Sequence, residues 1–308
     1  MKKNSKRRWV AALLISAILS GIIASNFSVS AQTETAPSND LPVQRNRATD
    51  IDSQENNNTS SHSAQVNLYI NNEIVEVTNY LINDTTYVPL RAICDEIDEC
   101  EISWNNGIAS VKSNEVMMTV QQGSNYIEAN ERIIYHEQPI LNLESRIYVP
   151  VRSLAKIYNL NVTWHGESKS VYLAGNPKGL KKGRDFYAEE DLYWLSRIIH
   201  AESSGESLKG KIGVGNVIIN RKNRNDYPNT IKAVIFDKKY GTQFTPVANG
   251  TIYNSPSQES IKAAKIVLDG YSINEKIIFF INPKIASNFW VTENRTFVIR
   301  IGNHSFYK

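Results

Sequence analysis

A five-residue pattern occurs twice in this chain, about 60 residues apart, and strongly constrains how its middle part can fold. Tyr87-Val-Pro-Leu-Arg91 returns as Tyr148-Val-Pro-Val-Arg152, and the tryptophan of Ile102-Ser-Trp104 returns as Trp164. Each copy is preceded by alternating strands, followed by a short amphipathic helix and closed by two further strands. Residues 65–175 are therefore expected to form a repeated α+β module.

This pattern resembles the copper amine oxidase N-terminal domain, a stalk-like module found on many exported bacterial proteins. The Tyr-Val-Pro-x-Arg signature carries the resemblance, which covers about 110 residues. It implies an accessory module that could contact a regulatory or wall-anchoring protein, and it does not imply copper chemistry. His136 and His165 are too few and too scattered to make a metal site, and we expect both at the surface.

The first 31 residues are typical of a secretory signal peptide. Five lysines and arginines lie between Lys2 and Arg8, and the apolar run Val10–Ala24 that follows is too short for a comfortable membrane span. An uncleaved anchor is the alternative, and in either case the chain is expected to be exported. Residues 32–64 are polar and lack large apolar clusters, so we expect a disordered linker there.

Charge is divided between the two halves of the chain. Residues 32–184 carry 13 Lys/Arg and 19 Asp/Glu, whereas residues 185–308 carry 16 and 12. A mildly basic C-terminal half suits an anionic polymer such as cell wall, but it is too weak to indicate nucleic-acid binding. Export would also permit a disulfide between Cys94 and Cys100, which the spacing leaves open.

The stretch from Trp194 to Glu206 places a carboxylate where an apolar side chain is expected. Ile198 and Ile199 recur at helical spacing, and Glu202 continues the same face near the helix end, with Gly205 as a left-handed cap. Desolvation and the helix dipole both favour the protonated form of such a carboxyl group, as a general acid requires. The alternative is a glutamate that turns outward at a fraying end.

The remaining elements predict an α+β domain over residues 185–308, joined to the module by a short Gly/Lys-rich linker over 176–184. The glycines Gly210, Gly213 and Gly215 lower helix stability, so we expect close packing against another element there. In chain order we expect helices over 189–203, 207–222 and 230–237, a long loop over 240–250, a helix from a capping box at 255–258 to 270, a strand over 277–281, and a hairpin over 295–307.

Several kinds of chemistry are excluded by the residues present in this domain. His200 and His304 are too few for a zinc site, no Gly-x-Ser-x-Gly elbow is present, and the glycines match no phosphate-binding loop. Neither cysteine lies near Glu202. Acid–base catalysis by a carboxylate, without metal or cofactor, is what remains.

Five motifs then resemble the spore cortex-lytic, SleB-type cell-wall hydrolase family, in the family's order. They are Ile199-His-Ala-Glu202-Ser-Ser-Gly-Glu206, Val214-Gly-Asn-Val-Ile-Ile-Asn-Arg221, Gln243-Phe-Thr-Pro-Val247, Asn282-Pro283 and Ile301-Gly-Asn-His-Ser-Phe306. The resemblance implies a lysozyme-like, mainly helical fold with a small β region, in the cell wall, outside the cell or in the spore envelope. It implies that Glu202 cleaves peptidoglycan between N-acetylmuramic acid and N-acetylglucosamine, with a role in spore germination as one setting.

Further site residues are weaker expectations. Gln243, Phe244, Asn282 and His304 could bind substrate, although loop packing or turn formation would equally account for the first three. His200 and Glu206 are expected to support the site, with Glu206 capping or stabilising the next helix rather than acting as a nucleophile. Without a nucleophile the favoured reaction is lytic transglycosylation. Muramidase activity, N-acetylmuramoyl-L-alanine amidase activity and a non-catalytic wall-binding module are the alternatives.

Overall fold

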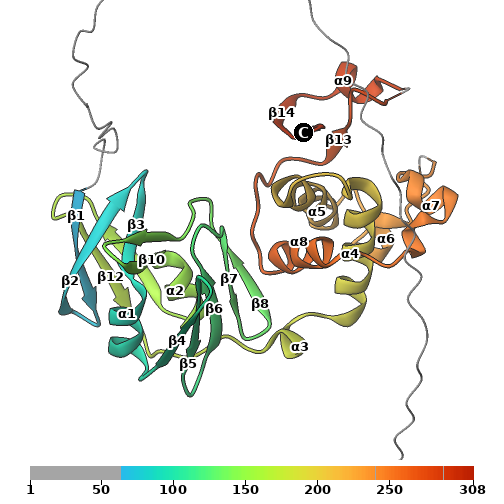
Figure 1. Ribbon diagram of the computed structural model, residues 1–308. Coiled ribbons are helices and arrows are strands. Elements are labelled where there is room, and N and C mark those ends of the chain that lie inside the picture. Colours follow the sequence, from blue (N-terminus) through green and yellow to red (C-terminus); the bar gives the residue numbers. More distant parts are fainter. Residues whose placement is uncertain (1–63, 240, 287) are drawn as a thin grey trace, which may run out of the picture. The chain divides into compact units, whose positions relative to one another are not determined.

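The computed structural model describes residues 64–239, 241–286 and 288–308, which belong to one compact unit (Figure 1). The predicted signal peptide, and the predicted linker up to residue 63, lie outside the described residues. Two hydrophobic cores are present, one in the module and one in the C-terminal domain. Among the described helices, none combines the length and apolar character that crossing a membrane requires.

The module contains two sheets and two short helices (Figure 1). One sheet has the strand order β11-β12-β1-β2-β3-β10-β9 and the other β4-β5-β6-β7-β8. The strands are β1 (Ala64–Ile70), β2 (Glu73–Ile82), β3 (Thr85–Pro89), β4 (Glu101–Asn105), β5 (Ile108–Lys112), β6 (Met117–Gln121), β7 (Tyr126–Ala129), β8 (Arg132–Tyr135), β9 (Leu141–Leu143), β10 (Arg146–Pro150), β11 (Asn161–His165) and β12 (Ser170–Ala174), and the helices are α1 (Leu90–Ile97) and α2 (Val151–Ile157).

The two repeats pair with each other through their signature strands. Val88 of β3 lies directly opposite Val149 of β10, and the flanking tyrosine and proline of each repeat pair with the proline and tyrosine of the other. The first strand of the described residues, β1, pairs in parallel with the last strand of the module, β12. The predicted repeat is therefore confirmed, and its two copies form one interlocked structure.

The tyrosines of the repeated Tyr-Val-Pro pattern add hydrogen bonds between the two repeats. Tyr87 donates a hydrogen bond to the Pro139 carbonyl at 2.7 Å, and Tyr148 donates one to the Thr78 carbonyl at 3.1 Å. The two acceptors occupy equivalent positions of the repeat, and both tyrosines are buried. Each tyrosine therefore reaches from its own repeat into the other, which gives a physical reason for tyrosine at this position.

One expectation for the module needs correction, and one question that the spacing left open is answered. His136 is buried rather than at the surface, and its Nδ1 lies 2.6 Å from the Gln138 carbonyl oxygen. Cys94 and Cys100 are free thiols. Burial raises the pKa of both thiols, since a thiolate is poorly solvated there.

The predicted linker over 176–184 is held against the module rather than left free. Its Lys178 amide donates to the Tyr158 carbonyl at 2.9 Å. A side chain at Gly179 would place a Cβ 2.2 Å from the Glu115 carbonyl oxygen, so only glycine permits this approach. The segment leads into the short helix α3 (Gly183–Phe186).

The C-terminal domain is mainly helical and ends in a three-stranded sheet of order β13-β15-β14 (Figure 1). The α+β class is confirmed. The helices are α4 (Glu189–Ser203), α5 (Leu208–Lys222), α6 (Ile231–Ile235), α7 (Thr245–Asn249), the 3-10 helix η1 (Thr251–Tyr253), α8 (Gln258–Leu268) and α9 (Trp290–Asn294), and the strands are β13 (Phe279–Ile281), β14 (Phe297–Ile301) and β15 (His304–Tyr307).

Local details differ from the sequence prediction in three places. One is the helix α9, which forms over residues where no helix was expected. The expected loop over 240–250 contains the helix α7, which begins next to Pro246. The helix α8 is capped by the Ser257 hydroxyl, which accepts from the Ser260 amide at 3.2 Å, so Pro256 precedes the helix instead of opening it.

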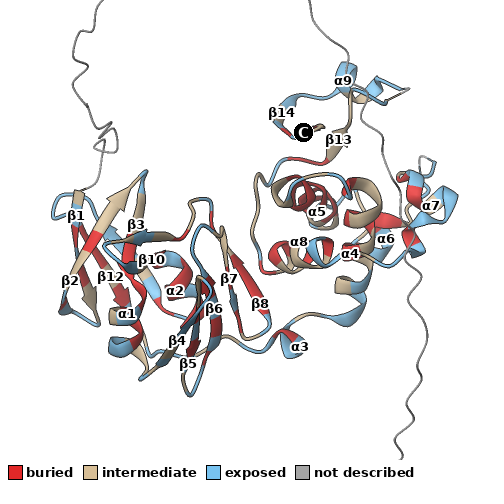
Figure 2. Ribbon diagram, in the orientation of Figure 1, coloured by how far each residue is buried: buried red, intermediate tan, exposed pale blue. Residues whose placement is uncertain are grey.

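Close packing explains the glycines of α5, as expected. A Cβ at Gly213 would lie 2.5 Å from Cζ of Phe306, and one at Gly215 would lie 2.9 Å from Cδ1 of Ile199. Figure 2 shows the buried residues gathered along α5 between its neighbours. The glycines therefore let the sheet and α4 approach the α5 backbone.

A buried charge cluster joins the module to the C-terminal domain. Asp269, which follows α8, accepts from Nε of Arg132 on β8 at 3.0 Å and also from the Tyr187 hydroxyl. Lys156 of α2 donates to the Asp269 carbonyl at 2.7 Å. Because Asp269 and Arg132 have almost fully buried side chains, this contact depends on their mutual pairing.

Lysines of the C-terminal domain also bind the acidic module at other positions. Lys209 lies 2.8 Å from the Glu137 carboxylate, and Lys265 donates to the Glu131 carbonyl at 3.0 Å. Part of the positive charge that the sequence assigned to a wall polymer is therefore used inside the chain, against the module.

Candidate active site

Glu202 occupies the last turn of α4, at the position expected from the apolar face of that helix. The residue is partly buried, and desolvation raises the pKa of its carboxyl group to about 7. Within the described ranges, its carboxylate has neither a hydrogen-bond donor nor an ion-pair partner. Its oxygens are not among the enclosed polar atoms that lack a partner, so they reach solvent. This geometry suits a carboxyl group that gives up and takes back a proton near neutral pH.

The end of α4 differs from the expected glycine cap. Ser204 keeps a right-handed helical conformation, and Gly205 is not among the residues with positive φ. The chain instead turns directly into α5, with the Glu206 amide donating to the Ser203 carbonyl at 3.0 Å. The left-handed cap predicted at Gly205 is therefore wrong.

Glu206 binds the turn of the C-terminal hairpin. Its Oε2 accepts from the Asn303 amide at 3.1 Å, and its Oε1 accepts from the Asn303 side chain at 2.9 Å. Desolvation would raise the pKa of this carboxyl group, but the hydrogen bonds from Asn303 outweigh it and lower the pKa. Gly302 has φ +57°, and a Cβ there would lie 2.0 Å from Glu206 Oε2. The carboxylate is thus engaged in structure, while Ser207 caps α5.

His304 lies beneath this turn and is buried. Its ring centroid lies 5.3 Å from that of Phe280, and its Nδ1 has no hydrogen-bond partner within the described part of the chain. Desolvation lowers the pKa of the imidazole, although the nearby Glu206 carboxylate opposes this. Burial therefore favours the neutral form of the His304 imidazole, on the first residue of the hairpin strand β15.

His200 joins the end of α4 to the start of α8. Its Nδ1 accepts from the Ser257 amide at 3.4 Å and lies 3.4 Å from the Ser260 hydroxyl. The histidine therefore fixes the two helices relative to each other two residues before Glu202. The supporting role expected for His200 in catalysis stays a prediction.

The other three expected substrate-binding residues have local structural roles. Phe244 is 3% exposed and stacks on Phe280, with ring centroids 6.4 Å apart. The Gln243 side chain donates to the Gly241 carbonyl at 3.0 Å, and the Asn282 side chain accepts from the Lys284 amide at 3.0 Å. Loop packing and turn formation account for these contacts, and substrate contact by any of the three stays a prediction.

The sequence pattern did not reveal one buried charge beside the site. Lys211 in α5 has a 1% exposed side chain, binds the Glu259 carboxylate at 2.7 Å and also donates to the Glu206 carbonyl. It lies beside the apolar stripe of its helix, so periodicity gave no signal for it. Lys211 ties α5 to α8 next to the segment that carries Glu202 and Glu206.

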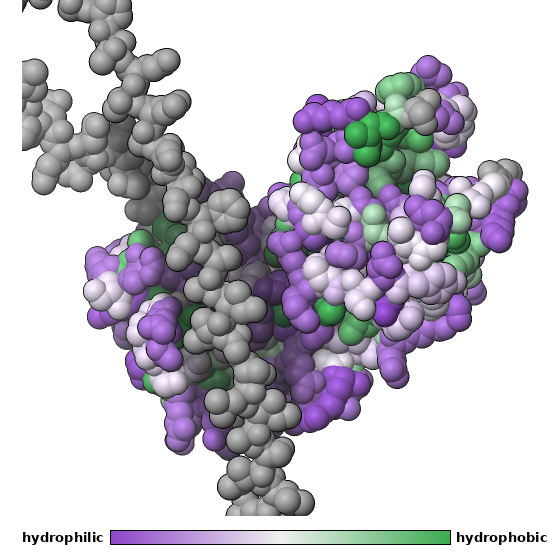
Figure 3. Space-filling model, turned by 45° about the vertical axis from the view of Figure 1, so that its right-hand side comes forward, coloured by the Kyte–Doolittle hydropathy of each residue, from purple (hydrophilic) through white to green (hydrophobic). Residues whose placement is uncertain are grey.

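An exposed apolar surface on the C-terminal segment was also not anticipated. Figure 3 shows hydrophobic residues gathered on the outer part of this segment, around α9. Its exposed side chains are Ile285, Phe289, Trp290 and Phe297. Exposed apolar groups of this size commonly mark binding surfaces. No cluster of three or more His, Cys, Asp or Glu side chains suited to a metal ion occurs in residues 64–239, 241–286 and 288–308.

Comparison with known proteins gives two family matches. The Cell Wall Hydrolase family model matches residues 205–307, and the Copper amine oxidase N-terminal domain model matches residues 69–173. Both recognitions made from the motifs are confirmed. The first match begins three residues after Glu202.

Relatives and solved structures resemble the C-terminal part. A spore cortex-lytic enzyme of Bacillus cereus is 32% identical over 122 residues, which are 40% of this chain and 46% of the relative. One of Bacillus subtilis is 31% identical over 120 residues, 39% of this chain and 38% of the relative. The chain thus spans less than half the length of these relatives.

Two solved structures show a similar level of identity. The catalytic domain of the germination-specific lytic transglycosylase SleB from Bacillus anthracis is 32% identical, with 40% of this chain and 97% of that chain covered and a TM-score of 0.36. The catalytic domain of the Bacillus cereus SleB protein is 32% identical, with 40% and 92% covered and a TM-score of 0.36.

Proposed function

We propose that this chain, which carries a cell wall hydrolase domain of the spore cortex-lytic type behind a copper amine oxidase N-terminal domain, cleaves the glycan strands of peptidoglycan. The bond cleaved lies between N-acetylmuramic acid and N-acetylglucosamine, and Glu202 is the acid and then the base. The observation that supports this most is the partly buried Glu202 carboxyl group, whose pKa is raised to about 7.

The proposed reaction needs only one carboxyl group. Protonated Glu202 gives its proton to the glycosidic oxygen as the bond to the N-acetylglucosamine breaks. The resulting carboxylate then takes the proton of the muramic 6-hydroxyl, whose oxygen attacks the anomeric carbon. The product is a 1,6-anhydro-muramic end, and no water is consumed.

The environment of Glu206 favours transglycosylation over a route with a carboxylate nucleophile. Both of its oxygens accept hydrogen bonds from Asn303. A nucleophile would have to give up those contacts in order to attack the sugar. The muramic hydroxyl is therefore the acceptor that we favour, with water as the alternative in a muramidase reaction.

The setting follows from the chain organisation and the relatives. The expected signal peptide would export the protein, and the curated relatives are spore cortex-lytic enzymes. We place the activity at the cell wall or spore envelope, with peptidoglycan as the substrate and cortex breakdown during germination as one role. The module is the natural contact for a regulatory or anchoring protein.

Mass spectrometry of digested, purified peptidoglycan tests the proposal. Anhydro-muramic ends from the wild type, and none from the Glu202→Gln variant, are expected. Glu189→Gln, which removes an exposed carboxylate from the same helix, is the matched control and should digest normally. New reducing ends would replace transglycosylation by muramidase activity. Newly freed alanine amino groups would overturn glycan cleavage in favour of an amidase, and binding without any product would leave a wall-binding module.

A further inference from the structure

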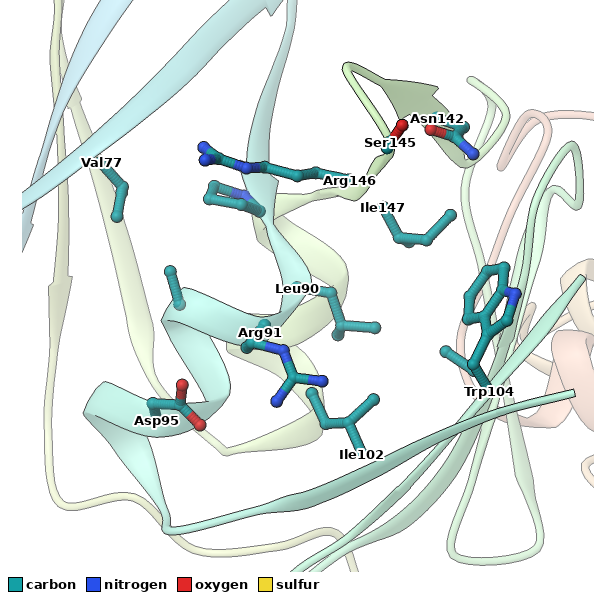
Figure 4. A pocket seen from close by; sticks show the side chains of 13 residues that line it. Val77, Leu90, Arg91, Asp95, Ile102, Trp104, Asn142, Ser145, Arg146 and Ile147 are labelled. Atoms are coloured by element: carbon teal, nitrogen blue, oxygen red, sulfur yellow. The ribbon is translucent and has the colours of Figure 1, made fainter.

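A cavity of about 770 Å³ lies in the module, away from Glu202 (Figure 4). Trp104 of β4 stands at one end of it, with its ring near Leu90 and Ile147, and Arg91 and Arg146 enter from two different elements (Figure 4). The volume is typical of sites that hold a small molecule. The other lining residues include Val77, Asp95, Ile102, Asn142 and Ser145.

Trp104 and Arg91 are the side chains of this cavity most open to a ligand, whereas the Asn142 side chain donates to Gln122 at 3.3 Å. Trp104 is 52% exposed, so a large part of its indole ring is open to a ligand. Among the described residues, Arg91 has neither an ion pair nor a side-chain hydrogen bond, and Arg146 has no ion pair, although its guanidinium interacts with the Tyr148 hydroxyl. Two guanidinium groups and one acid, Asp95, give the cavity a positive balance inside an otherwise acidic module.

The second repeat contains an equivalent cavity of about 590 Å³. Arg152 and Trp164 line it at the positions that Arg91 and Trp104 occupy in the first repeat. The fold has therefore built the same kind of cavity twice, once beside the helix of each repeat. A recurrence of this kind shows that the Arg and Trp positions belong to the architecture of the cavity.

Of these two cavities, the second is lined in part by described residues of the C-terminal domain and the first is not. Tyr271 of the C-terminal domain lines it and donates a hydrogen bond to Glu137, and Lys156 at its edge is bound to Asp269. The repeat position of Arg146 is Thr85 there, and that of Asp95 is Lys156, so the two cavities place their charged side chains differently. The first cavity receives no side chain from the described part of the C-terminal domain.

We propose that the first cavity binds a saccharide fragment of peptidoglycan that bears a carboxylate. The sugar ring lies on the face of Trp104, and the lactyl or stem-peptide carboxylate is bound by Arg91 and Arg146. Indole rings present a flat apolar face to the C–H groups of a sugar, and guanidinium groups match a carboxylate in shape and charge. Asn142 and Ser145 supply hydrogen bonds to the ring substituents. The choice of ligand rests on the proposed function.

Such a site would hold the enzyme on its polymer while Glu202 acts elsewhere. Two linked sites on one chain bind a long glycan strand more tightly than either site alone. The module then contributes to retention on the wall and leaves the chemical step unchanged.

Calorimetric titration of the full chain with the soluble disaccharide tetrapeptide of peptidoglycan tests the site. This fragment contains the bond from the N-acetylglucosamine anomeric carbon to the muramic acid. It lacks the bond from the muramic anomeric carbon to a following N-acetylglucosamine, which the proposed reaction cleaves, so it cannot be consumed. Trp104→Ala is expected to weaken binding roughly tenfold, and Arg91→Ala by a similar factor. Trp104→Phe retains a stacking ring and should restore most of the affinity. Trp164→Ala and Arg152→Ala are the matched controls in the other repeat and should stay within about twofold of the wild type.

The outcomes separate this inference from the proposed function. Unchanged binding in Trp104→Ala, an equal loss in Trp164→Ala, or no binding of the fragment by the wild type overturns the site. Chitotriose, which has no carboxylate, should bind more weakly and ignore Arg91→Ala, and equal affinity would overturn the role of the arginines. A protein that binds the fragment through Trp104 but cleaves no glycan would overturn the proposed function alone. An active enzyme whose binding ignores Trp104 would overturn this site alone.

Discussion

The carboxylate of Glu206 holds the Asn303 turn with two hydrogen bonds, at 3.1 Å from the backbone amide and 2.9 Å from the side chain. Glu206 and Glu202 lie four residues apart and have opposite environments. Neighbouring donors lower the pKa of Glu206, whereas burial without a partner raises the pKa of Glu202. Two nearby carboxyl groups are thereby assigned to different tasks.

Removing the Glu206 carboxylate should destabilise the protein without removing the chemistry. Glu206→Ala is expected to lower the free energy of unfolding by about 1–3 kcal/mol, because it leaves the donors of Asn303 unpaired. Urea denaturation of Glu206→Ala, Asn303→Ala and the double variant measures their coupling. Folded Glu206→Ala should still release anhydro-muramic fragments. Complete loss of product at unchanged stability would instead show that Glu206 takes part in the reaction.

Stability should depend on pH through Glu202. Its folded pKa, about 7, lies above the ordinary value of 4.5, so the folded state binds more protons than the unfolded state between these values. The free energy of unfolding therefore falls as pH rises from about 4.5 to about 7. Glu202→Gln has no carboxylate to desolvate. The difference in free energy of unfolding between this variant and the wild type should therefore shift in favour of the variant by roughly 1–3 kcal/mol when the pH is raised from 4 to 8. Thermal unfolding at the two pH values, with Glu189→Gln as control, measures this, and a constant difference would contradict it.

The pH dependence of catalytic activity should also reflect the ionisation of Glu202. If protonated Glu202 is the acid, kcat on purified glycan strands falls as pH rises through about 7. The decline should follow a single ionisation, because burial alone raises the pKa of Glu202 and no charged group among the described residues contributes to the shift. A rate that keeps rising to pH 9 would contradict Glu202 as the proton donor.

The buried cluster around Asp269 should be among the most sensitive points of the fold. Asp269→Ala leaves Arg132 and Tyr187 buried without their acceptor, and we expect a loss of about 3–5 kcal/mol in urea denaturation. Asp226→Ala breaks the exposed pair of Asp226 with Arg224, 2.9 Å apart, and should change nothing measurable. Similar small effects from both would show that the module does not depend on this contact.

The glycines of α5 give a sharp steric test. Gly213→Ala would place a methyl group 2.5 Å from the Phe306 ring and should cost about 1–3 kcal/mol, because the hairpin must shift. Gly205→Ala meets no atom within 4 Å and sits at ordinary backbone angles, so it should be neutral or slightly stabilising. Equal thermal midpoints for the two variants would contradict the packing described for α5.

The helices of the C-terminal domain were predictable because their apolar spacing is regular. The α4 boundaries match the sequence pattern, since Ile198, Ile199 and Glu202 share a face and the chain turns at Ser203–Gly205. The helix α7 was missed because Thr245-Pro-Val-Ala-Asn249 is only five residues long. A segment this short has too little periodicity to distinguish it from a loop.

The parts of the site that could not be predicted are long-range contacts. Nothing near Glu206 in sequence indicates that its partner is Asn303, 97 residues later. Lys211 likewise pairs with Glu259 on another helix. The repeat was visible from Tyr87 and Tyr148, but its interlocking was not, because local patterns carry no information on which strands pair.

The tyrosine hydrogen bonds between the repeats determine whether one copy of the repeat can fold without the other. The Tyr87 hydroxyl donates to the Pro139 carbonyl, and the Tyr148 hydroxyl donates to the Thr78 carbonyl. A gene that encoded one copy would leave a buried hydroxyl without an acceptor and an edge strand without a neighbour. Neither copy should therefore fold stably without the other, and a protease that cut between the copies would release no stable half.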